Sequence, residues 1–80
     1  MFASKDNKIA IFKILIILGA NSAQCGLNLK NYSKALTFGL KALKRMQAAK
    51  DIFSKEDFET HFAELDKKVL YRIGEAKNNL

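Results

Sequence analysis

Apolar residues recur along this chain at the three- and four-residue spacing of amphipathic helices. The first such segment, residues 8–18, is almost continuously apolar and is interrupted only by Lys13. We expect it to form a long helix that is buried on most sides and continues into the segment beginning at Asn21. The polar residues 1–7 are expected to lie outside this helix and to fray.

A second helical pattern follows a turn that we place at residues 29–32. Asn31 or Ser33 can cap this helix, because the side-chain oxygen of either residue can accept a hydrogen bond from a free backbone N–H. The pattern extends toward Phe53. Its inner side is expected to carry Leu36, Leu40 and Leu43, and its outer side Lys34, Lys41 and Lys44.

A third helix is predicted by Ser54 and, three residues later, Asp57, which together form a capping-box arrangement. It ends near Asn78, and its carboxylates are expected on a solvated face. The apolar residues expected on its inner side are Phe58, Phe62, Leu65, Val69, Leu70 and Ile73. The chain has no proline and is rich in alanine, leucine and lysine. We therefore expect one all-α domain, an antiparallel helical hairpin plus a third long helix.

Small residues stand where the first two helices would touch. They recur at helical spacing within each half of the hairpin and are Ala23, Gly26, Ala35, Gly39 and Ala42. Because small side chains let two helix backbones approach closely, this spacing favours a tight helical hairpin. Such a hairpin cannot bury its apolar face alone, so it needs neighbouring helices.

Residues 21–43 resemble one tetratricopeptide repeat, in particular the co-chaperone version with Asn-x-Ala-x-Cys, then Leu-Lys-x-Tyr, then Lys-Ala-Leu. Residues 68–76 are similar to the opening helix of a following repeat, which often reads Lys-Ala-Leu-Tyr-Arg-Arg-Gly-Glu-Ala. Gly74 would then be equivalent to Ala23, at a separation longer than the roughly 34 residues of one repeat. The resemblance thus implies a repeat at about 16–46 and an opening helix at 67–80, as part of a superhelical array. The insertion between them, at about 47–66, is expected to lengthen the second and third helices.

The same resemblance implies a ligand site. In the co-chaperone subgroup, five side chains from successive repeats hold the terminal carboxylate of a peptide, and Asn21, Lys68 and Arg72 match three of them. Lys68 and Arg72 are also one helical turn apart, where two cations repel each other unless an anion lies between them. From the spacing alone, an ordinary solvated pair is the alternative.

The function implied by the resemblance is binding of the acidic C-terminal tail of heat-shock protein 90 or 70 in the cytoplasm. No enzymatic activity, cofactor or metal is expected, since His61 has no partner at catalytic or metal-ligand spacing. One alternative is the corresponding part of an FKBP-like or cyclophilin-like peptidyl-prolyl isomerase whose catalytic domain lies elsewhere. Another is a structural module that self-associates through residues 9–18, which we expect in any case for the isolated chain.

Charge and cysteine content add little at this level. The net charge of +6 comes mainly from lysines scattered along the chain, so we expect neither nucleic acid nor a membrane as partner. Cys25 cannot form an internal disulfide, which favours a reducing compartment, and we expect it to pack on an apolar helix face. The weaker alternative is a secreted protein: Lys5 and Lys8, an apolar stretch and then small residues at 19–23 are the order of a signal peptide.

Overall fold

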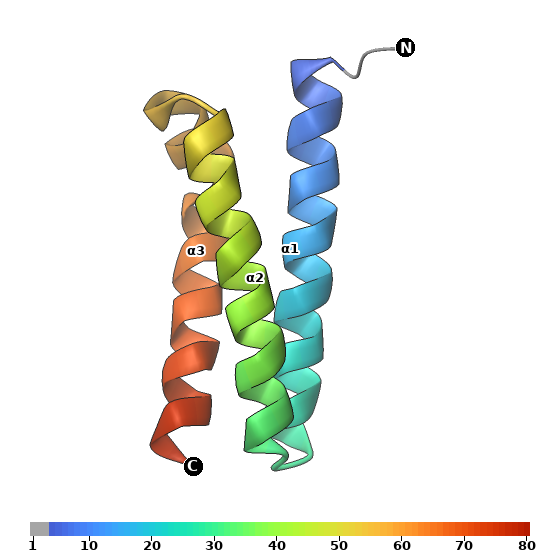
Figure 1. The fold of residues 1–80 in the computed structure, drawn as a ribbon, viewed down its shortest axis with the longest axis vertical. Helices are drawn as coiled ribbons and strands as arrows, with labels where there is room; N and C mark the ends of the chain where they lie inside the picture. The colour runs from blue at the N-terminus through green and yellow to red at the C-terminus, as the bar shows by residue number, and fades with distance from the viewer. Residues whose placement is uncertain (1–3) are drawn as a thin grey trace.

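Three long helices make up the structure, a computed structural model that describes residues 4–80 (Figure 1). They are α1 (Lys5–Asn28), α2 (Tyr32–Ile52) and α3 (Lys55–Asn78), and no strand occurs within the described range. Each helix runs antiparallel to the one before it, and all three pack against one another. The expected all-α fold, a hairpin plus a third long helix, is confirmed. Residues 47–66 do not form a separate element, because they lengthen α2 and α3 on either side of a short corner.

The helix starts follow the capping residues. Asn31 Oδ1 accepts a hydrogen bond from the Lys34 backbone N–H at 3.3 Å, and Ser54 Oγ accepts one from Asp57 at 3.2 Å, as predicted. The expectation for residues 1–7 was wrong in part. α1 begins at Lys5, because Ser4 Oγ caps it by accepting a hydrogen bond from the Asn7 N–H. The first three residues lie outside the described range.

The turn between α1 and α2 depends on one residue in the left-handed region. Lys30 has φ of 58°, a conformation that commonly ends helices. Three backbone hydrogen bonds close the turn, among them one from the Asn31 N–H to the Gly26 carbonyl at 2.8 Å. The reversal is therefore tight enough to bring α2 straight back along α1.

The hairpin is closely packed because glycines and alanines face each other across it. A Cβ atom placed on Gly26 would lie 2.8 Å from the backbone nitrogen of Ala35, and one on Gly19 would lie 3.0 Å from Ala42 Cβ. Gly39 makes similar room for α3, since a Cβ there would meet Ile73 Cγ1 at 2.7 Å. The predicted contact of small residues between α1 and α2 is thus confirmed for Gly26 and Ala35, whereas Gly39, expected at the same contact, faces α3 instead.

Gly26→Ala is expected to lower the free energy of unfolding by about 1–3 kcal/mol, because the clash is with backbone atoms that cannot rotate away. Gly74→Ala is the matched control. Nothing lies within 4 Å of a Cβ at Gly74, so the better helix propensity of alanine should raise stability there by about 0.5–1 kcal/mol. Urea unfolding followed by circular dichroism measures both. Equal effects at the two positions would contradict close packing at Gly26.

The core runs along the inside of the three helices and is densest near the α2–α3 corner. There Phe53 stacks on Phe62, which stacks on Phe58, with ring centroids 5.7 and 5.5 Å apart. Phe12 of α1 meets Phe53 edge-on at 5.6 Å. The cluster therefore joins all three helices at the end of the bundle where α1 begins and α2 ends. The other buried side chains of this core cluster are Ile9, Ile16, Ala20, Ala42, Met46, Ala49, Val69 and Ile73.

An ion pair joins the starts of α1 and α3. Lys5 Nζ lies 2.6 Å from Asp57 Oδ2. The hydrogen bond from Lys5 lowers the pKa of Asp57 below its ordinary 3.8, and the same contact raises the pKa of Lys5 above 10.5. The capping carboxylate of α3 thus also ties that helix to α1.

This ion pair predicts how stability depends on pH. Because the folded-state pKa of Asp57 is lowered, its contribution is complete above the unfolded value of 3.8 and is lost as pH falls through the lower folded value. Asp57→Asn should therefore flatten the decline of melting temperature between about pH 5 and pH 2. Glu64→Gln, at an exposed position, is the control and should leave the decline unchanged. Parallel curves for wild type and Asp57→Asn would contradict the role of the pair.

One side of α1 is exposed. Ile11, Ile14 and Leu18 are 52, 58 and 58% exposed, so the expectation of a helix buried on most sides was wrong, because α2 and α3 cover its other sides. Cys25 is exposed as well, which corrects the expectation that it packs, because it lies two turns beyond Leu18 on the same side. Leu40 and Leu70 are also exposed, contrary to the core positions expected for them.

By length and composition α1 could also cross a membrane. Its most apolar 18-residue window has a mean hydropathy of 1.6, and one third of that window is buried in the structure. The core helix of a soluble protein and a signal sequence have the same composition, so this property does not assign the helix to a membrane.

Candidate peptide-binding groove

Asn21, Lys68 and Arg72 lie together on the surface between α1 and α3. They line a hollow of about 190 Å³ with Ile17, Ala20 and Leu65. A second hollow of about 310 Å³ is lined by Gln24, Lys67, Lys68, Tyr71 and Arg72. We call the two together the groove, because they share Lys68 and Arg72. Asn21 of α1 thus meets Lys68 and Arg72 of α3, which follow it by 47 and 51 residues in the sequence.

Arg72 is held against α1 by its inner nitrogen. Its Nε donates a hydrogen bond to Gln24 Oε1 at 3.2 Å, and Gln24 Nε2 donates in turn to Asn28 Oδ1 at 3.0 Å. Within residues 4–80 this is the one hydrogen bond of the guanidinium group, so both Nη groups remain available as donors. Gln24 therefore orients the arginine fork while leaving its outer edge free.

The positive charge of the groove is not neutralised by neighbouring carboxylates. Neither Lys68 nor Arg72 forms an ion pair with any side chain of the described range. Lys67 adds a third cation at the wall of the larger hollow. Because like charges one turn apart repel each other, an anion between them is favoured. The groove is therefore electrostatically suited to an anionic group.

The walls combine donors with apolar surface. Ile17, Ala20 and Leu65 form the apolar part of the smaller hollow, beside the Asn21 amide. An arginine fork can bind both oxygens of a carboxylate, a lysine supplies a mobile point charge, and an asparagine amide donates a further hydrogen bond. The arrangement can thus hold a carboxylate next to a small apolar group.

Gln24 and Tyr71 are among the groove residues that were not predicted from the sequence. Gln24 lies three residues after Asn21, hence on the same side of α1, and this spacing was a usable signal. Tyr71 is 68% exposed at the edge of the larger hollow. An exposed tyrosine carries no signal of its own, because only the packing of α3 against α1 places it beside the groove.

A larger hollow, of about 490 Å³, lies elsewhere, between α3 and the end of α2. It is lined by Lys50, Lys55, Phe58, Glu59, Ala63, Asp66 and Lys67. Asp66 Oδ1 is buried there without a hydrogen-bond partner, and Lys50 Nζ lies 3.9 Å from Asp66 Oδ2. The expectation that the α3 carboxylates lie on a solvated face was therefore wrong for Asp66, because α2 extends far enough to cover it.

Metal-ligand geometry is not seen in the part of the chain that the structure describes: no three histidine, cysteine or acidic side chains gather there. The identification of the groove rests on its geometry and on the residues that resemble a tetratricopeptide repeat. No protein-family model, no curated protein and no solved structure matches this chain.

Proposed function

We propose that this chain is a tetratricopeptide-type protein-interaction module that binds the acidic C-terminal tail of heat-shock protein 90 or 70. The terminal carboxylate of that tail would be held by Asn21, Lys68 and Arg72. One observation carries the proposal: these three residues, chosen by resemblance alone, line a single hollow. Such a ligand would place the interaction in the cytoplasm.

The arrangement of helices is compatible with this proposal. α1 and α2 form a hairpin through small residues, and α3 follows where the first helix of a next repeat would begin. The groove lies between α1 and α3, the two helices that would open successive repeats. In an array of hairpins, the first helices of neighbouring repeats line one continuous surface, which suits an extended peptide.

The affinity expected of three donors is modest. A hydrogen bond to a charged group contributes about 1.5–3 kcal/mol when well formed. Part of this free energy is offset by the cost of immobilising a flexible peptide. We therefore expect a Kd on the order of tens of micromolar, or weaker, for a short tail peptide.

The proposal is tested by titrating a Glu-Glu-Val-Asp peptide with a free terminal carboxylate against the same peptide amidated at that end. Loss of the carboxylate removes the charge that Lys68 and Arg72 would contact, so amidation should weaken binding about tenfold or more. A heteronuclear NMR titration suits affinities in this range and reports which residues respond. Equal binding of the two peptides, or shifts confined to residues outside the groove, would contradict a carboxylate site.

A further inference from the structure

The positive charge of this protein is concentrated in α1 and α2. Residues 7–50 contain eight lysines and arginines and no aspartate or glutamate. Six of the eight acidic residues follow in the α3 segment, and the other two are Asp6 and Asp51. The net positive charge therefore lies in α1 and α2, whereas the α3 segment has nearly as many basic as acidic residues.

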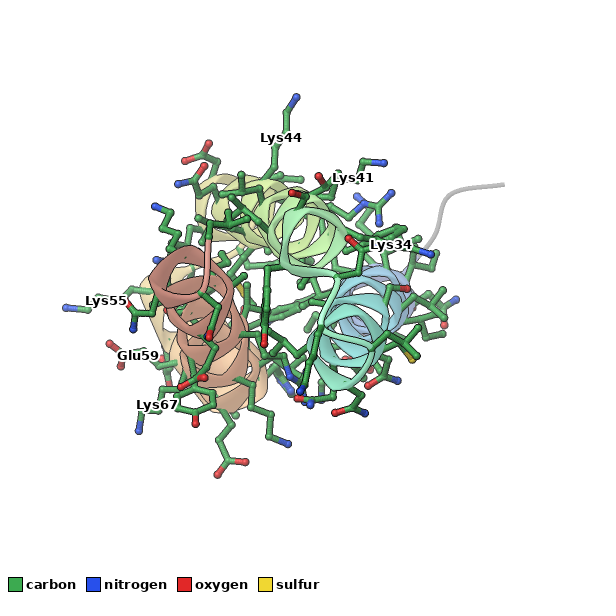
Figure 2. All side chains as sticks on the ribbon, turned by 90° about the horizontal axis from the view of Figure 1, so that it is seen from below. Lys34, Lys41, Lys44, Lys55, Glu59 and Lys67 are labelled. Atoms are coloured by element: carbon green, nitrogen blue, oxygen red, sulfur yellow. The ribbon has the colours of Figure 1, made fainter. Side chains whose placement is uncertain are left out.

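The outward side of α2 carries a line of these cations. Lys34, Lys41 and Arg45 follow at seven- and four-residue spacing, with Lys44 beside them, and all four are exposed. Figure 2 shows Lys34, Lys41 and Lys44 pointing outward from α2, away from the side where Lys55 and Lys67 leave α3. We call these four residues the basic stripe.

The basic stripe is long and has no ion-paired carboxylate among the described residues. It extends about 16 Å along the helix, at 1.5 Å per residue. Within the described range none of its four side chains forms an ion pair. Phe38 lies between two of them, with Lys34 Nζ and Lys41 Nζ at 5.9 and 5.4 Å from the ring centroid.

The exposed apolar side of α1 borders the stripe. Arg45 Nη1 reaches across to the Leu15 carbonyl oxygen, 3.5 Å away. Ile11 and Leu18 are the neighbours of Leu15 one turn before and after it on the helix surface. With Ile14 they form what we call the apolar band, which contains no carboxylate. A basic stripe and an apolar band thus lie side by side.

We propose that this face docks on the surface of a bilayer that contains acidic phospholipids, independently of the peptide groove. The stripe would lie against the headgroup phosphates while the band enters the boundary between headgroups and acyl chains. The proposal departs from the expectation from sequence that no membrane is involved, which treated the lysines as scattered. It does so because four exposed cations of α2 lie beside exposed isoleucines of α1.

Charge and shape favour a bilayer over two other occupants. A second copy seated on the same face would bring two basic stripes together, and like charges at close range oppose such a dimer. Single-stranded nucleic acid is bound by successive aromatic platforms, whereas this face offers Phe38, which is half-buried, and aliphatic side chains. Exposed isoleucines beside cations suit lipid better than either.

Co-sedimentation with vesicles tests the proposal on the full chain. Wild type should bind vesicles containing about a third phosphatidylserine, bind neutral phosphatidylcholine vesicles far more weakly, and be released by high salt. Lys34→Gln with Lys41→Gln should weaken binding about 25-fold, at roughly fivefold per cation. Lys55→Gln with Lys77→Gln on α3, both exposed and outside the groove, is the charge-matched control and should change binding less than threefold.

A second pair of substitutions examines the apolar band. Ile14→Gln with Leu18→Gln should weaken vesicle binding by roughly tenfold or more, because band burial contributes alongside charge. Both positions are exposed, so circular dichroism should show an unchanged fold. An equal loss in both lysine pairs, binding that resists high salt, or no binding to either vesicle type overturns the proposal. Binding of a single-stranded RNA oligonucleotide that is tighter than binding of vesicles also overturns it. So does a concentration-dependent dimer that is abolished by Ile14→Gln with Leu18→Gln, if the wild type does not bind vesicles.

Discussion

Replacing Phe62 with alanine is expected to lower the free energy of unfolding by about 3–5 kcal/mol, the usual loss when a buried phenylalanine is truncated. Phe62 is fully buried in α3, and its ring stacks on both Phe53 and Phe58. Removing it leaves a cavity at the point where the α2–α3 corner meets α1. An 80-residue domain has about 4–12 kcal/mol of stability in total, so the variant is expected to be close to unfolded at room temperature.

Urea unfolding at several temperatures measures this loss, and Leu70→Ala is the matched control on the same helix. Leu70 is half exposed, so its truncation should cost less than about 1 kcal/mol. If Phe62→Ala lost no more stability than Leu70→Ala, the aromatic cluster would not be the centre of the core. Should the variant unfold completely, Phe62→Leu, which leaves a smaller cavity, gives a measurable intermediate value.

Replacing Arg72 with alanine is expected to weaken binding of the Glu-Glu-Val-Asp peptide by about 10- to 100-fold, the loss of one charge-assisted hydrogen-bond pair. The two Nη groups of Arg72 would each donate a hydrogen bond to one carboxylate. No other arginine lines the groove. Isothermal titration or peptide NMR at matched ionic strength measures the change. Because the affinity of the wild type is already weak, the affinity of Arg72→Ala has to be measured at high protein concentration.

Lys44→Ala is the control for this experiment, since it removes the same charge from a side chain that points outward from α2, as expected from the sequence (Figure 2). It should change peptide affinity less than twofold in moderate salt, where distant exposed charges are screened. Gln24→Leu tests the orientation of Arg72 apart from its charge, because it keeps the arginine but removes the acceptor of its Nε–H. Its loss of peptide affinity is expected to lie between those of Lys44→Ala and Arg72→Ala. Equal affinities for wild type and Arg72→Ala would make Lys68 and Arg72 a solvated pair.

Self-association through residues 9–18 stays a prediction, and the charge distribution argues for lipid at the same surface. Sedimentation of the chain in low and high salt separates the two, because salt would screen repulsion between like-charged copies and strengthen a dimer. Vesicle binding changes in the opposite direction with salt. Added salt should thus strengthen a dimer and weaken vesicle binding, which distinguishes a second copy from lipid at the apolar band.

Local features of the fold were predictable because they depend on neighbours in sequence. The caps at Asn31 and Ser54, the turn at residues 29–32 and the small residues of the hairpin arise from hydrogen bonds and steric contacts within a few residues or from simple helical spacing. Lys68 and Arg72 belong to the same class, since an i, i+4 spacing places two side chains on one side of any helix.

The sequence by itself determined that the chain forms three helices, where the second and third begin, and which cations are one turn apart. Only the tertiary structure decided which side of α1 is covered, because an almost continuously apolar segment has no periodicity that selects a side. That choice leaves Ile11, Ile14 and Leu18 exposed, and it brings Asn21 and Gln24 to Arg72. It also sets the lysines of α2 beside an apolar surface. Burial and electrostatic neighbourhood depend on contacts between residues far apart in the chain, and spacing within one helix does not specify them.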